Sequence, residues 1–344
     1  MKYKRLGKIL YHIAYSTNYA NFTKPTSITF DVTDRCLLHC KTCYKWLSKD
    51  ANNEIDTSSW KEIIYSLKQW LENYRVCISG GELFLRDDIF DIISFARKHN
   101  VYVTAISNGY HIDSTLAEKV IASGLNGISI TLNGITPGVH DFTRGMEGSY
   151  EKAIQAIDLL NKSKKNMFVC IGTVLMGYNQ NEIIDLIKFV KERHVDGITF
   201  QALHDTSTFH PFDHNDYFHA EGEWYKTHPL WPKDTHGMLS VIDKIAEYKK
   251  KGYPIGNSFI SLQWMKRYFQ DPKEILKTKC MVGMNNFSVD PYGKVRLCFN
   301  MNPIGNILSQ RPEQLWTNEK ALQQRRAIKT CKNTCRILMC NFDK

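Results

Sequence analysis

The chain has 344 residues, of which 43% are hydrophobic and 23% are charged, a composition typical of a globular protein with a large core and one or two domains. No run of about 18 apolar residues occurs, which excludes a conventional transmembrane helix. The formal net charge is +10, but lysines alternate with acids along the chain, which favours a solvated basic surface over a nucleic-acid-binding groove.

The first 25 residues combine a basic start with a short apolar stretch. Tyr11 and His12 interrupt the apolar part, so we expect residues 1–25 to form a helical lead-in rather than a signal peptide. The alternative is contact with a membrane surface through four basic residues, Lys2, Lys4, Arg5 and Lys8. Without an export signal we expect a cytoplasmic protein, in which the ten cysteines stay reduced and clustered cysteines bind metal.

Residues 26–201 alternate between two periodicities. Short β-branched runs predict six strands, at residues 27–33, 75–79, 101–107, 127–132, 168–175 and 197–200. Amphipathic helical stretches lie between them, the first with a capping box formed by Ser59 and Glu62. Six strand–helix units predict an α/β fold, a partial (β/α)6 TIM-type barrel, with ligands at the C-terminal ends of its strands.

The alternation stops at residue 202. Residues 202–275 are rich in aromatic residues and histidines, and we expect them to bridge over the mouth of the barrel. A hairpin is predicted around Tyr292 and Gly293, and a final helix near residues 312–328. Residues 276–344 predict a small cysteine-rich C-terminal domain. To take part in the chemistry, this domain must fold back near the C-terminal ends of the strands.

Three cysteines, Cys36, Cys40 and Cys43, follow the first predicted strand. A structural zinc site needs four ligands, so three thiolates fit it poorly unless His39 joins them. An iron–sulfur cubane held by three cysteines leaves one iron able to bind a substrate or a cofactor. The Cys-x3-Cys-x2-Cys loop resembles that of the radical S-adenosylmethionine (SAM) superfamily, in which SAM is the ligand of the fourth iron of a [4Fe–4S] cluster.

Further motifs at the ends of the second, third and fourth strands carry the same resemblance, namely "ISGGELF", "ISNGY" and "SITLNGITPGVHDFTRG". It implies SAM contacts for Gly80, Gly81, Glu82, Asn108, Thr131 and Arg144. Glycine lets backbone carbonyls approach the amino group of SAM closely, because no Cβ obstructs them. The guanidinium fork of the arginine suits the carboxylate of SAM.

The C-terminal cysteines form a second group, Cys280, Cys298, Cys331, Cys335 and Cys340. They resemble the SPASM and shortened twitch extensions of the superfamily, which hold auxiliary iron–sulfur clusters. Five cysteines imply one auxiliary [4Fe–4S] cluster, with the first four as favoured ligands and Cys340 as the candidate replacement. A small zinc site built from the same residues is the alternative.

Two other cysteines, Cys77 and Cys170, lie inside predicted strands. A buried cysteine usually acts as a small hydrophobic side chain. The alternative is that one of them faces the interior of the barrel and donates a hydrogen atom to a substrate radical.

The resemblance implies an enzyme that cleaves SAM reductively and uses the 5′-deoxyadenosyl radical to abstract hydrogen from a substrate. We expect maturation of a peptide or protein, or another oxidative modification, with a donor such as flavodoxin or ferredoxin supplying electrons. The alternative substrates are small molecules, for a dehydrogenase or epimerase of a sugar, aminocyclitol or nucleoside. The alternative from another class is a non-catalytic zinc-binding interaction protein.

Overall fold

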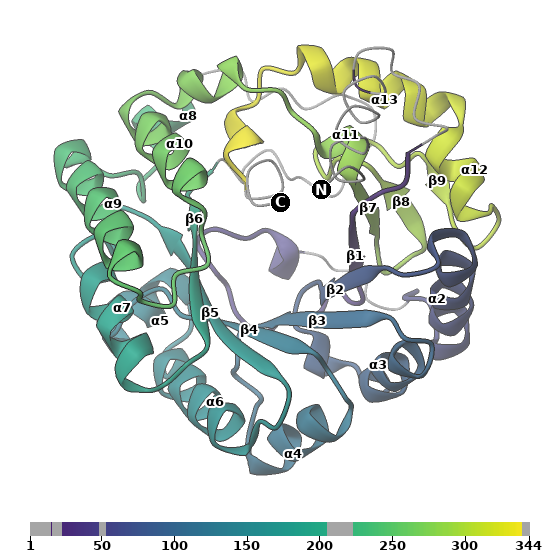
Figure 1. Ribbon diagram of the computed structural model, residues 1–344, viewed down its shortest axis with the longest axis horizontal. Coiled ribbons are helices and arrows are strands. Elements are labelled where there is room, and N and C mark those ends of the chain that lie inside the picture. The colour runs from purple at the N-terminus through teal and green to yellow at the C-terminus, as the bar shows by residue number, and fades with distance from the viewer. Residues whose placement is uncertain (1–14, 16–22, 48–52, 205–222, 339–344) are drawn as a thin grey trace.

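The computed structural model describes residue 15 and residues 23–47, 53–204 and 223–338. These residues form a nine-stranded sheet with the order β6-β5-β4-β3-β2-β1-β7-β8-β9. Strands β1 to β6 are parallel, and Figure 1 shows the sheet curling with the helices on its outer side. The predicted partial TIM-type barrel is therefore confirmed.

The barrel strands are β1 (Ser27–Asp31), β2 (Arg75–Ser79), β3 (Tyr102–Ser107), β4 (Gly127–Thr131), β5 (Phe168–Leu175) and β6 (Gly197–Ala202). The helices of this part are α2 (Thr57–Leu71), α3 (Ile89–Lys98), α4 (Ser114–Ala122), α5 (Pro137–Arg144), α6 (Ser149–Ser163) and α7 (Ile183–Glu192). All six strands lie where the sequence predicts them, to within two residues at each end, because their alternating burial follows the two-residue period of a strand.

The two faces of the curled sheet differ in polarity. Phe30 points outward and packs on Trp60 of α2, with ring centroids 5.0 Å apart. Its neighbours Thr29 and Asp31 therefore point inward, since successive side chains alternate. Inward positions on the other strands are likewise only partly buried, and the inward-facing Ile106 is 47% exposed. The outer face thus carries the core, and the inner face is left for other contacts.

The chain after β6 forms helices α8 (Trp224–Thr227), α9 (Thr235–Lys250) and α10 (Phe259–Gln270). The segment before α10 covers the edge of β6, where Ile255 forms a bridge with Ile198. The side chain of Asn257 completes this cover by bonding both backbone groups of Phe200, at 2.7 and 2.8 Å. None of the helices described here is both long and apolar enough to cross a membrane.

The C-terminal part extends the same sheet beyond β1, at the edge opposite β6. It contains α11 (Val282–Asn285), β7 (Asn286–Val289), β8 (Lys294–Arg296), β9 (Gly305–Asn306), α12 (Pro312–Thr317) and α13 (Glu319–Thr330). Strand β7 pairs in parallel with β1, and β7 and β8 form the predicted antiparallel hairpin. Short 3₁₀ helices occur at Lys45–Leu47, Leu83–Leu85, Pro272–Lys277 and Thr334–Ile337.

Two local predictions about helix ends are wrong. Helix α2 begins earlier than the expected capping box, because the Asp56 side chain caps it by accepting the Ser59 N–H at 2.8 Å. The single helix expected near residues 312–328 is two helices. Asn318 separates them in an extended conformation and caps α13 by accepting the Ala321 N–H. The lead-in helix expected for residues 1–25 lies outside the described residues, apart from Tyr15 and the stretch after residue 22.

Candidate functional site

The three cysteines of the first group lie in the loop after β1. Cys40 is buried, and Cys36 and Cys43 are partly buried. Burial raises the pKa of Cys36 to about 11, and the charge of Cys40 adds to this effect. Burial likewise raises the pKa of Cys43, again with a contribution from Cys40. A bound metal would have to displace the protons of these thiols.

The arrangement of the loop fits a cluster better than a single ion. Among the described residues, no three His, Cys, Asp or Glu side chains converge as one metal ion requires. A cubane binds each cysteine through a different iron, so its thiols do not need to converge on one point. His39, the candidate fourth zinc ligand, instead packs edge-on against Trp46 with ring centroids 5.0 Å apart.

The glycines at the end of β2 carry the cysteine loop. The N–H of Gly81 donates to the Thr33 carbonyl at 2.7 Å, and the N–H of Glu82 donates to the Arg35 carbonyl at 2.8 Å. A Cβ on Gly81 would lie 2.1 Å from the Arg35 carbonyl oxygen, and one on Gly80 would lie 2.4 Å from the Thr33 carbonyl oxygen. Both positions therefore require glycine because the loop backbone packs directly on them.

Glu82 joins the ends of β2 and β3. Its carboxylate is 1% exposed and accepts hydrogen bonds from the Ser107 hydroxyl and the Asn108 N–H, both at 2.8 Å. Burial raises the pKa of this carboxyl group. The Asn108 side-chain amide lies 3.9 Å from the Cys36 sulfur. Both carboxylate oxygens of Glu82 thus accept hydrogen bonds from the protein itself. We infer that Glu82 holds Asn108 beside the cysteine loop.

Arg144 reaches the same loop from the end of α5. Gly145, which follows it, has a φ of +62°, and a Cβ there would lie 2.2 Å from the His39 carbonyl oxygen. The Nε of Arg144 is buried and has no hydrogen-bond partner among the described residues. A buried donor atom without a partner needs an acceptor, and a carboxylate meets that need. Thr131 lies at the end of β4 and is partly buried.

The loop between β4 and α5 is fixed by a buried histidine. His140 is fully buried, and its Nδ1 accepts the N–H of Asn133 at 3.1 Å. Burial lowers the pKa of His140 to about 3, so its imidazole is neutral. The Asn133 side chain in turn accepts the Val174 N–H at 3.1 Å. These bonds join the loop that leads to Arg144 to strand β5.

Sequence reasoning missed Lys45, which fastens the end of the cysteine loop. Its ammonium lies 2.6 Å from Asp34 and 3.2 Å from Asp31, and its N–H lies 3.4 Å from the Cys43 sulfur. Burial alone would lower the pKa of Lys45, but the two carboxylates outweigh this effect and raise it. The available signal was a lysine two residues after the third cysteine, with Asp31 and Asp34 shortly before the first.

The C-terminal cysteines share one neighbourhood. Cys280 and Cys298 pack with Ile328 in a small apolar cluster. The amide of Asn300, two residues after Cys298, lies 3.5 Å from the Cys335 sulfur. The cysteines of this group therefore come together from both ends of the domain.

Arg336 ties the remaining parts of this group together. Its guanidinium donates to the Thr278 carbonyl at 2.6 Å and also to the Cys331 carbonyl. Cys331 is thereby held near Cys280, two residues after Thr278. The fifth candidate, Cys340, lies outside the described residues.

The expected position of the C-terminal group is wrong. Strand β7 runs parallel to β1 with Asn286 opposite Ser27, so Cys280 lies before the start of these strands. Cys298 follows β8 at the same edge, because β8 runs antiparallel to β7. The group therefore lies at the N-terminal edge of β1 and β7, and the cysteine loop lies at the C-terminal edge. Four residue steps along β1 separate these edges by about 13 Å.

Cys77 and Cys170 both face inward. They lie at partly buried positions of β2 and β5. Burial raises the pKa of Cys77 to about 11 and raises that of Cys170, so both are protonated thiols at neutral pH. The charge of Cys170 makes a small further contribution to the raised pKa of Cys77.

Little of the histidine-rich segment is described. His204 lies 3.4 Å from the Gln201 amide, and His228 accepts the Leu230 N–H at 3.2 Å and packs on Trp224. Its other members, among them His210, His214 and His219, lie outside the described residues, as does the basic stretch proposed to contact a membrane.

Comparison with known protein families agrees with this geometry. Residues 30–190 match the radical SAM superfamily, and residues 280–341 match the SPASM iron–sulfur cluster-binding domain. The chain is a radical SAM protein with a C-terminal SPASM domain. Its cofactors are therefore SAM, a [4Fe–4S] cluster that binds SAM, and auxiliary iron–sulfur clusters in the SPASM domain. The protein is an enzyme of the radical SAM type.

Relatives of this radical SAM protein differ in how much of it they match. The mycofactocin maturase of Mycolicibacterium smegmatis is 32% identical over 40% of this chain and 35% of its own length. The AdoMet-dependent heme synthase of Methanosarcina barkeri is 25% identical over 93% of this chain and 89% of its own. The structure of Streptococcus suis SuiB bound to its precursor peptide SuiA shares the fold, with a TM-score of 0.67, 13% identity, and coverage of 92% of this chain and 71% of that one.

Proposed function

We propose that this radical SAM enzyme performs a net oxidation of a peptide, at a site between the cysteine loop and the SPASM domain. The observation that carries the proposal is the placement of the two cysteine groups beyond opposite ends of β1, a strand about 13 Å long, with inward-facing side chains between them. A substrate held there would lie between the SAM-binding end and an electron acceptor.

At the SAM-binding end, Cys36, Cys40 and Cys43 are the proposed ligands of the [4Fe–4S] cluster. Arg144, with its unused buried donor, would bind the carboxylate of SAM, and Asn108 would lie beside the cluster and the adenosine. When bound, the cluster and SAM supply a 5′-deoxyadenosyl radical that abstracts a hydrogen atom. The protein holds the loop in place through the packing at Gly81 and the ion pairs of Lys45.

The proposed oxidation requires one electron from an external donor for each product formed. One electron from a flavodoxin- or ferredoxin-like donor would be needed to cleave SAM to methionine and the radical, which would leave as 5′-deoxyadenosine after taking one hydrogen atom from the substrate. The substrate radical then gives up one electron and one proton, so the product has lost two hydrogens. The proposed auxiliary ligands Cys280, Cys298, Cys331 and Cys335 would hold the electron acceptor.

A redox-neutral epimerisation is the competing outcome at the same site. It needs a hydrogen donor, and the inward-facing, protonated thiols of Cys77 and Cys170 are the candidates. A thiol hydrogen exchanges with solvent, so such a donor would place solvent hydrogen on the carbon of the product.

The relatives support a peptide substrate. The mycofactocin maturase, the PqqA peptide cyclase and the subtilosin biosynthesis protein AlbA match part of the chain, and SuiB binds a precursor peptide. A tetrapyrrole is the second candidate substrate, because the heme synthase matches over 93% of the chain. The peptide is favoured because several peptide-modifying relatives share the chain's domain pair or fold.

The test is a single-turnover reaction of the anaerobically reconstituted, dithionite-reduced enzyme with SAM. It is run in deuterated water with pools of synthetic peptides and, separately, with an iron coproporphyrin. We expect a peptide product two mass units lighter, formed with one 5′-deoxyadenosine and without deuterium on carbon. Oxidation would be refuted if the wild-type product carried deuterium on carbon and the Cys170→Ala or Cys77→Ala variant no longer introduced it. A peptide substrate would be refuted if the enzyme converted only the tetrapyrrole.

A further inference from the structure

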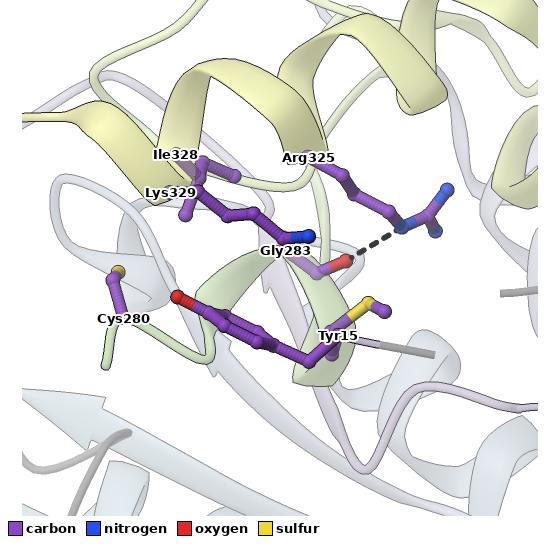
Figure 2. A pocket seen from close by; sticks show the side chains of 7 residues that line it. Tyr15, Cys280, Gly283, Arg325, Ile328 and Lys329 are labelled. Carbon is purple, nitrogen blue, oxygen red and sulfur yellow. Dashed lines mark hydrogen bonds between the residues drawn. The ribbon is translucent and has the colours of Figure 1, made fainter. Parts of the chain in front are cut away.

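A tyrosine from the N-terminal segment lies against the auxiliary site. Tyr15 and Cys280 line the same small cavity, together with Gly283, Met284, Arg325, Ile328 and Lys329. Figure 2 shows the Tyr15 hydroxyl turned toward the Cys280 sulfur, while the ring lies under the end of Lys329. Tyr15 and Cys280 are far apart in the sequence, so only the fold brings this phenol to a proposed cluster ligand.

Two lysine ammonium groups also lie close to the ring of Tyr15. The Lys279 ammonium lies 5.5 Å from the ring centroid, and the Lys329 ammonium lies 5.1 Å from it. Ammonium groups are attracted to the electron-rich face of an aromatic ring, so Tyr15 holds both lysines beside Cys280.

The surrounding chain adds basic residues without acids. Residues 320–342 contain no Asp or Glu and six basic residues, namely Lys320, Arg325, Arg326, Lys329, Lys332 and Arg336. A cubane held by four thiolates carries a net negative charge that grows when it accepts an electron. Nearby positive charge and hydrogen bonds to the ligand sulfurs therefore stabilise its reduced form.

We propose that Tyr15 is a positioning residue of the auxiliary cluster, whose hydroxyl donates a hydrogen bond to the Cys280 sulfur and whose ring holds Lys279 and Lys329 beside it. Together these groups raise the reduction potential of the cluster and suit it to accept an electron from the substrate radical. This inference rests on the proposed role of Cys280 as a cluster ligand.

The experiment is an EPR-monitored redox titration of the full-length, reconstituted chain carrying Cys36→Ala, Cys40→Ala and Cys43→Ala, so that only the auxiliary cluster contributes. In this background, Tyr15→Phe keeps the ring and removes the hydroxyl. We expect the reduction equilibrium to become about tenfold less favourable, which is about 59 mV for a one-electron couple, with the iron content unchanged. The control is Tyr65→Phe, since Tyr65 is a 49% exposed tyrosine on α2.

A second pair of variants tests the charge. Lys329→Gln should lower the potential, whereas Lys320→Gln, at an exposed position of the same helix, should not. Equal reduction potentials for the Tyr15→Phe and Tyr65→Phe proteins would overturn the proposal. Loss of the cluster in a variant that removes the whole ring, such as Tyr15→Leu, would not rescue it, because that loss would show only a structural role. A Cys280→Ala protein that keeps its auxiliary irons and its potential would instead refute the ligand assignment, and with it this inference.

Discussion

Replacing Gly81 by alanine tests how the cysteine loop is held. The new Cβ would lie 2.1 Å from the Arg35 carbonyl oxygen, whereas ordinary contacts begin at 3.4 Å, so the loop must move by about 3.4 − 2.1 = 1.3 Å. The nearest atoms belong to the backbone of Asp34 and Arg35, so no side chain can rotate away. The movement would break the hydrogen bonds from Gly81 to Thr33 and from Glu82 to Arg35.

The expected cost is the sum of two effects. Each lost backbone hydrogen bond costs about 1 kcal/mol, and overpacking adds about 1–3 kcal/mol, so the folded state should lose about 3–5 kcal/mol. Because the strain falls on the loop of Cys36, Cys40 and Cys43, we expect the Gly81→Ala protein to retain few of the irons at that site.

The assay combines urea unfolding with iron analysis after anaerobic reconstitution. The matched control is Gly138→Ala, because a Cβ at Gly138 meets no atom within 4 Å. We expect the control to keep the stability and iron content of the wild type. If the Gly81→Ala and Gly138→Ala proteins behaved alike, the loop would not depend on glycine at this position, and the reasoning would be refuted.

Three further predictions follow from single residues. Arg144→Ala should raise the Kd for SAM by about tenfold or more, since a charged hydrogen bond is worth about 1.5–3 kcal/mol; unchanged affinity in anaerobic calorimetry would contradict this. Lys45→Met should reduce iron retention at the SAM-binding site, whereas Lys41→Met, at an exposed position, should not; iron analysis compares the two. The pKa of His140 is about 3 in the folded state and near 6.5 when unfolded, so the unfolded state gains a proton first, and stability falls as pH drops between these values. Urea unfolding should show that the free energy of unfolding falls by about 2 kcal/mol between pH 7.5 and 5 because of His140. The His140→Gln protein should not show this decrease.

The barrel could be predicted from the sequence because its signals are local. Strand β1 alternates buried Ile28 and Phe30 with inward polar residues, and the other strands repeat the pattern. The break between α12 and α13 also had a local signal, the capping residue Asn318, which the helical pattern around it obscured.

The placement of the C-terminal domain could not be predicted in this way. It depends on the parallel pairing of Asn286 with Ser27, and such long-range pairing leaves no trace in the local pattern. The same reason hides the approach of Tyr15 to Cys280. The partly buried ion pairs of Lys45 lie nearer in sequence, but charged residues beside a loop usually remain solvated, so their pattern alone does not indicate this burial.

The most direct test of the two-cluster account is the iron content of the reconstituted chain. The wild type should hold about eight irons, as two [4Fe–4S] clusters, and the Cys36→Ala, Cys40→Ala, Cys43→Ala protein should hold about four. The Cys280→Ala, Cys298→Ala protein should also hold about four, now at the SAM-binding site. An unchanged iron content in the triple variant, or zinc in place of iron in the wild type, would contradict the account.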